Sequence, residues 1–142
     1  MSVAREFTMQ LAPDAPDIPG LIKALEAFFA ARNLPRGALS GFALAFDEIL
    51  TNIASYSAAR QPIQVRVVIM PDEVRALVID DGVPFDPLRL PPPDVTSGIE
   101  DRPIGGLGLY LVKKIMDRVG YERREPYNYF SFSKRIAEPT SP

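Results

Sequence analysis

The sequence contains neither cysteine nor histidine among its 142 residues. Without these side chains the protein has no disulfide, no thiolate zinc site, no thiol nucleophile, no Ser-His-Asp triad and no phosphohistidine chemistry. Any catalysis must therefore use carboxylates, amides, lysine or arginine, with or without a bound ion.

Long apolar segments are missing as well. The sequence has no continuous run of about 18 apolar residues, and Met1 to Leu11 contain no apolar segment of the kind found in signal peptides. We therefore expect neither export nor membrane insertion, and a cytoplasmic location. The formal net charge of −2 provides no broad positive surface, so we expect no direct contact with nucleic acid or a membrane.

A chain with 46% hydrophobic and 24% charged residues fits a single globular domain over residues 1–142. Its 15 prolines mark the non-repetitive segments. Residues 83–105 include Pro91-Pro92-Pro93, and a loop of this length is unusual in a compact domain unless it is functional or disordered. We interpret this segment as a lid, and residues 137–142 as a disordered tail.

Hydrophobic periodicity predicts helices and strands that do not alternate regularly along the chain. This order favours the α+β class, as a two-layer α/β sandwich with a mostly antiparallel sheet covered on one face by three helices. The predicted strands cover residues 6–11, 63–70, 74–79, 121–125 and 129–136, and the predicted helices cover residues 18–32, 36–57 and 106–118.

The third predicted helix has an apolar stripe that is expected to face inward. Gly120 is placed to terminate it. The residues expected to point inward are Leu107, Tyr110, Leu111, Ile115 and Met116.

Glu48 and Asn52 lie four residues apart on the second predicted helix, so their side chains share one face. An exposed polar pair would explain this spacing equally well if it stood alone. The flanking positions are apolar, however, which favours a polar stripe that faces a cavity. There the asparagine amide oxygen suits Mg²⁺, and the glutamate can orient or deprotonate a hydroxyl.

Asp80-Asp81-Gly82 follows an apolar strand, where Asp-Gly is by itself a common turn signal. In a functional site, the Asp80 carboxylate at the strand end could accept the exocyclic amino hydrogen of adenine and repel the carbonyl of guanine. Gly82 would then let the backbone pass close under the base.

Gly105-Gly106-Leu107-Gly108 opens the third helix, where backbone amides and the helix N-terminus favour anionic phosphates. A flexible helix-entry loop is the alternative explanation. The dinucleotide-binding fingerprint fails because Leu111 stands where its third glycine belongs, and no Gly-Lys-Ser/Thr sequence provides a P-loop. In fixed order, the three motifs together indicate an ATP site.

These motifs resemble the N, G1 and G2 boxes of the GHKL superfamily of ATPases, which includes gyrase, heat-shock chaperones, histidine kinases and mismatch-repair proteins. Within it, the single small domain is similar to the anti-sigma-factor serine/threonine-protein kinases, the histidine kinase-like ATPase modules of bacterial partner switching. The resemblance covers nearly the whole chain, from the first strand to Lys134-Arg135.

The resemblance implies a set of roles in binding ATP and Mg²⁺. Glu48 would be the catalytic base, Asn52 the Mg²⁺ ligand, Asp80 the adenine reader and Gly82 its companion. Backbone amides from Gly105 to Gly108 would contact the phosphates, with Gly106 and Gly108 as hinges of the lid. Ile104 stands where relatives carry an arginine, so Arg102 is the basic residue placed to reach the γ-phosphate.

The resemblance also implies an anti-sigma regulatory factor that phosphorylates a STAS-type anti-sigma-factor antagonist and sequesters a sigma factor or similar regulator. Relatives commonly form homodimers through a sheet edge. The alternative is a nucleotide-gated binding module that sequesters a regulator without phosphotransfer, which the proline-rich lid and Ile104 motivate. A domain without any nucleotide would require all three motifs to be coincidental.

Overall fold

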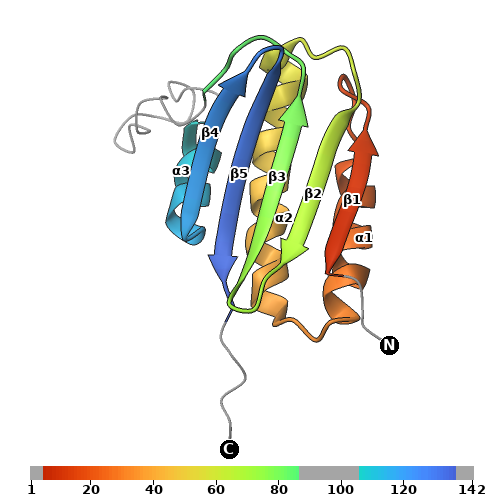
Figure 1. The fold of residues 1–142 in the computed structure, drawn as a ribbon, viewed down its shortest axis with the longest axis vertical. Helices are drawn as coiled ribbons and strands as arrows, with labels where there is room; N and C mark the ends of the chain where they lie inside the picture. The colour runs from red at the N-terminus through yellow and green to blue at the C-terminus, as the bar shows by residue number, and fades with distance from the viewer. Residues whose placement is uncertain (1–4, 87–105, 137–142) are drawn as a thin grey trace, which may run out of the picture.

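The computed structural model describes residues 5–86 and 106–136, which form a β-sheet covered by helices (Figure 1). The predicted α+β sandwich is confirmed. The expected lid beyond residue 86 and the expected tail lie outside the described residues. In chain order the elements are β1 (Glu6–Leu11), α1 (Ile18–Ala30), α2 (Arg36–Asn52), the π-helical turn η1 (Ile53–Ser57), β2 (Ile63–Ile69), β3 (Glu73–Asp80), α3 (Gly106–Ile115), β4 (Arg118–Arg124) and β5 (Tyr127–Arg135).

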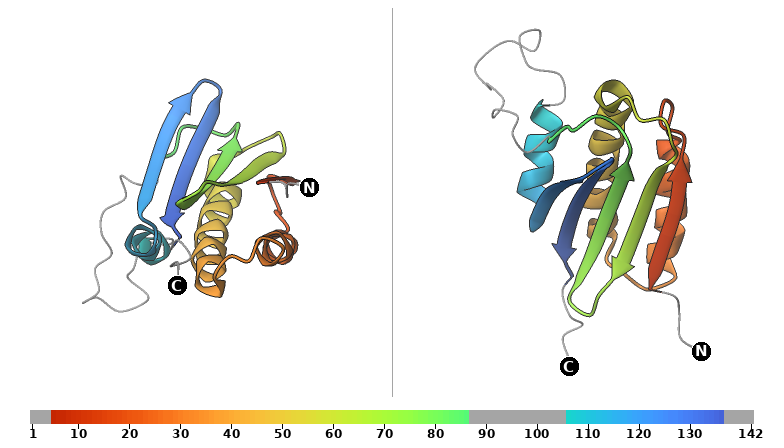
Figure 2. Two further views of the ribbon diagram at one scale, coloured as in Figure 1. Left: turned by 60° about the horizontal axis from the view of Figure 1, so that its bottom comes forward. Right: turned by 45° about the horizontal axis from the view of Figure 1, so that its top comes forward.

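The sheet has the order β1-β2-β3-β5-β4, and every neighbouring pair in it is antiparallel. Strand β2 shows why one face is covered: Ile63, Val65 and Val67 are buried, whereas the alternating Gln64 and Arg66 are exposed. The helices lie side by side on the buried face, with α2 between α1 and α3 (Figure 2). The site-bearing helix is therefore the central one.

A chain of aromatic rings joins the two layers. Phe29 of α1 meets Phe42 of α2 at a centroid distance of 5.8 Å, and Phe132 of β5 lies 5.7 Å from Phe42 and 5.1 Å from Phe46. Phe42 and Phe46 have no exposed surface. Such pairs contribute roughly 0.5–1.5 kcal/mol each beyond the burial of their area. They fix α2 against the sheet, and with it the side chains at its C-terminal end.

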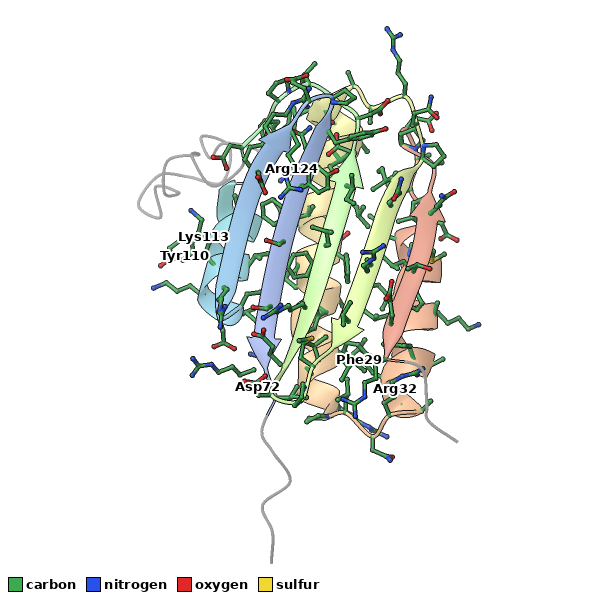
Figure 3. The ribbon with its side chains drawn as sticks, in the orientation of Figure 1. Phe29, Arg32, Asp72, Tyr110, Lys113 and Arg124 are labelled. Atoms are coloured by element: carbon green, nitrogen blue, oxygen red, sulfur yellow. The ribbon has the colours of Figure 1, made fainter. Side chains whose placement is uncertain are left out.

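The first helix shows how local sequence sets an element's start. Asp17 precedes α1, and its carboxylate accepts a hydrogen bond of 3.0 Å from the backbone N–H of Gly20. Pro19 lies in the first turn, where its missing N–H costs nothing. Past the end of the helix, Arg32 donates to the carbonyl of Phe28 and stacks over the Phe28 ring (Figure 3 labels Arg32).

The third helix differs from the sequence-based prediction. It ends at Ile115 because the Asp117 N–H already bonds to the Ser133 carbonyl at 2.9 Å, and β4 starts at Arg118 instead of residue 121. Gly120 lies within β4, opposite Ser131, and terminates no helix. The prediction that Gly120 terminates the third helix was therefore wrong.

The inward face of α3 is also shifted. Leu109, Val112 and Met116 are buried, whereas Tyr110 and Leu111 are 38% and 40% exposed. Figure 3 shows Tyr110 and Lys113 projecting away from the sheet. The apolar run Leu107 to Val112 offers more than one possible stripe, so the prediction of Tyr110 and Leu111 as inward residues was wrong. Across the described residues, no helix is long and apolar enough to cross a membrane.

Candidate functional site

Helix α2 changes its winding where the candidate site begins. It passes at Asn52 into the π-helical turn η1, which closes at Ala58 in the left-handed region with φ 55°. Because a π-helix bonds residue i to residue i+5, side chains five apart come to the same side. Asn52 and Ser57 accordingly line one pocket.

Glu48 and Asn52 share one face of α2, as their spacing predicted. The Asn52 side-chain amide donates to the Glu48 carboxylate over 3.4 Å, and Asn52 is only 6% exposed. Burial raises the pKa of Glu48; the Asn52 hydrogen bond opposes this rise, and the neighbouring charge of Asp47 adds to it. A half-buried carboxylate with a raised pKa is suited to accept a proton near neutral pH.

Gly108, in the first turn of α3, lies directly against Glu48. A Cβ atom at this position would overlap the Glu48 carboxylate. The N-terminal end of α3 therefore meets the acidic side chain of α2 through a residue that has no side chain. This contact brings the third sequence motif next to the first.

Asp80 ends β3 and is only 5% exposed. Its Oδ1 atom accepts hydrogen bonds from the Ser57 hydroxyl, from the Gly82 N–H at 2.8 Å and from the Asn128 side-chain amide at 3.1 Å. Within the described residues, Oδ2 accepts none. The second motif therefore supplies a buried acceptor oxygen held in one orientation.

Gly82 packs closely against Ser57. A Cβ there would overlap both the hydroxyl and the carbonyl oxygen of Ser57. The next residue, Val83, donates its N–H to that carbonyl over 2.7 Å. The neighbouring Asp81 accepts from the N–H groups of Arg60 and Gln61. Although partial desolvation raises the pKa of Asp81, these backbone hydrogen bonds outweigh it and lower the value.

One pocket connects these residues. Asn52 and Asp80 provide polar atoms on walls that are largely apolar, and Tyr56 stacks on Phe85 at a centroid distance of 5.9 Å. The cavity holds about 20 Å³ of open space, so a base enters only when a lining side chain shifts. Phe85 is the lining residue that lies outside helix and strand. The lining residues are Ile49, Asn52, Ile53, Ser57, Asp80, Phe85, Tyr121, Asn128 and Phe130.

The pocket includes side chains outside the three sequence motifs. Ser57, Phe85, Tyr121 and Asn128 carry no motif, and Asn128 reaches Asp80 only because β5 pairs with β3 in that register. Ser57 is the one of these residues that lies close to a motif in the sequence, five residues after Asn52. Its side chain reaches the pocket through the π-helical turn. Strand pairing was needed to bring Tyr121 and Asn128 to Asp80.

Several predicted site residues have no described side chain. Arg102 and Gly105 lie outside the described residues, and Gly106 and Leu107 are described only as backbone at the start of α3. Among the described residues, no group of three or more acidic side chains could hold a metal ion. The Asn52 amide oxygen fits Mg²⁺ nevertheless, because this ion usually takes few protein ligands and completes its shell with phosphate and water.

Comparison with known proteins gives a family match over most of the chain. A family model described as a histidine kinase-like ATPase domain matches residues 11–134. The serine/threonine-protein kinase BtrW of Bordetella bronchiseptica is 28% identical over 97 residues, which cover 66% of this chain and 68% of that protein. The serine-protein kinase RsbW of Bacillus cereus is 30% identical over 82 residues, covering 54% of this chain and 51% of RsbW.

A solved structure gives the same fold. The crystal structure of the RsbU and RsbW domains of Rv1364c from Mycobacterium tuberculosis superposes with a TM-score of 0.69 at 14% sequence identity. The match covers 96% of this chain and 34% of that one. The aligned region spans about half the length of the RsbW relatives.

Proposed function

The chain belongs to the histidine kinase-like ATPase family, and from this premise we propose that it is an ATP-dependent protein serine/threonine kinase acting as an anti-sigma regulatory factor. Its substrate is a serine or threonine on a STAS-type antagonist, and in the alternative complex of this partner switch it sequesters a sigma factor or similar regulator. The observation that carries the proposal is the pocket shared by Asn52 and Asp80, with Glu48 hydrogen-bonded to Asn52 beside it.

Recognition of the nucleotide begins with Asp80. Its buried Oδ2 is an acceptor that suits the exocyclic amino group of adenine, and the apolar walls of the pocket suit the faces of the base. The Phe85 side chain must rotate aside to admit the ring, because the open space is small. Residues 83–105 form the proposed lid, and Phe85 lies in the part of it that is described.

The phosphates lie towards the other end of the site. The N-terminus of α3, which begins at Gly106, favours their negative charge. Asn52 would hold Mg²⁺ through its amide oxygen, and the ion supplies charge neutralisation on the phosphates. Arg102 is the proposed contact of the γ-phosphate.

Glu48 performs the acid–base step in this proposal. Its carboxylate accepts the proton of the partner's hydroxyl while that oxygen attacks the γ-phosphorus in line, and ADP leaves as the phosphoester forms. The raised pKa of Glu48, caused first by burial, supports proton acceptance near neutral pH. The names of the relatives, which are serine or serine/threonine kinases, support the same chemistry.

Calorimetric titration of ATP and GTP, with and without Mg²⁺, tests the nucleotide site. We expect saturable Mg²⁺-dependent binding of ATP, little binding of GTP, and weakening by at least tenfold in Asp80→Asn, because an amide nitrogen then competes for the acceptor position. Asp72→Asn is the matched control. Asp72 directly precedes β3, at the end of the sheet opposite to Asp80, which ends that strand (Figure 3). Absence of ATP binding under every condition would refute the proposal.

Transfer is tested separately with a purified STAS partner and γ-labelled ATP. Glu48→Gln should abolish labelling of the partner serine while ATP affinity stays within about threefold of wild type. Glu26→Gln, an exposed change on α1, should preserve both properties. Wild-type protein that binds ATP and the partner without labelling it would instead be a nucleotide-gated binding module.

A further inference from the structure

A chain of hydrogen bonds runs from the loop after β3 to the carboxylate of Asp80. The Phe85 N–H donates to the Tyr121 hydroxyl over 3.2 Å, and that hydroxyl donates to the side-chain oxygen of Asn128. The Asn128 amide nitrogen then donates to Asp80 Oδ1 over 3.1 Å. The four groups come from two strands, a strand end and a loop, so the chain exists only in the folded protein.

The direction of this chain is fixed by its first member. A backbone N–H such as that of Phe85 can only donate, so the single proton of the Tyr121 hydroxyl must go to Asn128. The Asn128 amide group then faces Asp80 and also donates to the Val83 carbonyl over 2.9 Å. A flipped amide would set its oxygen against two other acceptors, so Asn128 has one favourable orientation.

Ser57 hydrogen-bonds to the same carboxylate oxygen. Its hydroxyl donates to Asp80 Oδ1, and the Gly82 N–H donates there as well. Oδ1 therefore receives donors from η1, from the turn after β3 and from β5. A carboxylate held at one oxygen by three donors cannot rotate to exchange its two oxygens without breaking all three hydrogen bonds.

We propose that Ser57, Tyr121 and Asn128 are positioning residues that hold Asp80 with Oδ2 as its only available acceptor, and that they thereby set the preference for a 6-amino over a 6-keto purine. This inference rests on the proposed nucleotide site. A carboxylate free to rotate could admit a water molecule that bridges to a keto oxygen. Because Asp80 is buried and its carboxylate is fixed, it cannot rotate to admit such a water. A keto oxygen is then placed directly against Oδ2 and is repelled.

The test uses ATP and ITP, because these nucleotides differ only at position 6 and the adjoining N1 proton of the purine. Dissociation constants are measured by titration for wild type, Tyr121→Phe and Ser57→Ala. We expect wild type to prefer ATP, and each variant to reduce the ratio of ITP to ATP dissociation constants by about threefold to tenfold, the effect of one lost hydrogen bond.

Two matched controls remove hydroxyls outside the network. Tyr129→Phe changes a tyrosine of β5 that packs beneath Arg124, and Ser55→Ala changes an exposed serine within η1. Both should keep the wild-type ratio. Thermal unfolding of every variant verifies that the fold is retained, which we expect because Tyr121→Phe keeps the ring.

The outcomes separate this inference from the function on which it rests. Wild type that prefers ATP, with variants that keep its ratio or lose both nucleotides equally, overturns the positioning role and leaves the nucleotide site intact. Wild type that binds no ATP overturns both. A reduced ratio in Tyr121→Phe and Ser57→Ala, but in neither control, establishes the positioning role.

Discussion

At the scale of the residue, the Glu48 carboxylate is both partly buried and held by a hydrogen bond. Its carboxylate is half-buried beneath Gly108, yet the hydrogen bond from Asn52 keeps it oriented. Burial raises the pKa of Glu48, against the smaller effect of that hydrogen bond. The ionised form of Glu48, which the proposed reaction requires, therefore lowers the free energy of unfolding of the free protein at neutral pH.

Glu48→Gln should accordingly stabilise the protein at neutral pH. The folded protein binds the Glu48 proton more tightly than the unfolded chain does, so the stabilisation by that proton is complete below about pH 4.5, the ordinary value for glutamate. It is lost as pH rises through the raised pKa of the folded state. The advantage of Glu48→Gln should therefore grow from pH 4 to pH 8, as measured by urea unfolding across that range.

The exposed Glu26→Gln provides the comparison for this experiment. Its free energy of unfolding should follow that of wild type at every pH. An advantage of Glu48→Gln that is equal at pH 4 and pH 8 would contradict the assigned environment of Glu48.

At the scale of the element, the packing of α3 on α2 sets the position of the proposed base. The contact is made through Gly108, and the buried Leu109 and Val112 continue the same face of α3. The two helices therefore approach closely at the carboxylate, with a hydrophobic contact below it. A larger residue at position 108 has the flexible Glu48 side chain as its nearest obstacle.

Gly108→Ala should separate activity from stability. The new methyl group displaces the Glu48 carboxylate, and a misplacement of about 1 Å can reduce turnover by roughly a hundredfold. The free energy of unfolding should change by less than about 1 kcal/mol, because alanine also favours the helix. Phosphotransfer rates and urea unfolding measure the two effects.

Gly37→Ala on α2 is the matched change, since nothing lies within 4 Å of a Cβ built there. It should keep the wild-type rate and be as stable as wild type or slightly more so. Full activity in Gly108→Ala would show that the base does not depend on this helix contact.

At the scale of the whole molecule, the aromatic contacts couple the sheet to the helices. Phe132 of β5 packs against both Phe42 and Phe46 of α2, and the same strand carries Asn128 into the pocket. The core and the site therefore share β5 and α2. Loss of packing at one end of this assembly is expected to affect the entire domain.

Phe132→Ala should destabilise the domain by about 3–5 kcal/mol, the usual cost of removing a buried phenylalanine. Helix and sheet signals should still disappear together on urea unfolding, because a single core holds both layers. Tyr110→Ala, at a position that is 38% exposed, should cost less than about 1 kcal/mol. Separate transitions for helix and sheet, or equal costs for the two variants, would contradict this account.

Much of the fold could be predicted from local patterns. The alternation in β2, the polar pair on α2 and the Asp-Gly turn after β3 depend on residues close together in the sequence. The apolar face of α3 could not be predicted in the same way, because its continuous apolar run fits more than one stripe. Contact with α2 at Gly108 selects the stripe that is buried.

The sequence by itself determined the class of fold, the helix that carries Glu48 and Asn52, and the identity of the motif residues, because spacing and turn chemistry are local properties. The tertiary structure alone decided how Asp80 is held. Asn128 lies 48 residues away from it, Ser57 lies 23 away, and the two reach its carboxylate through a strand pairing and a π-helical turn. Such contacts depend on the register and winding of distant segments, which packing fixes only when the whole domain folds.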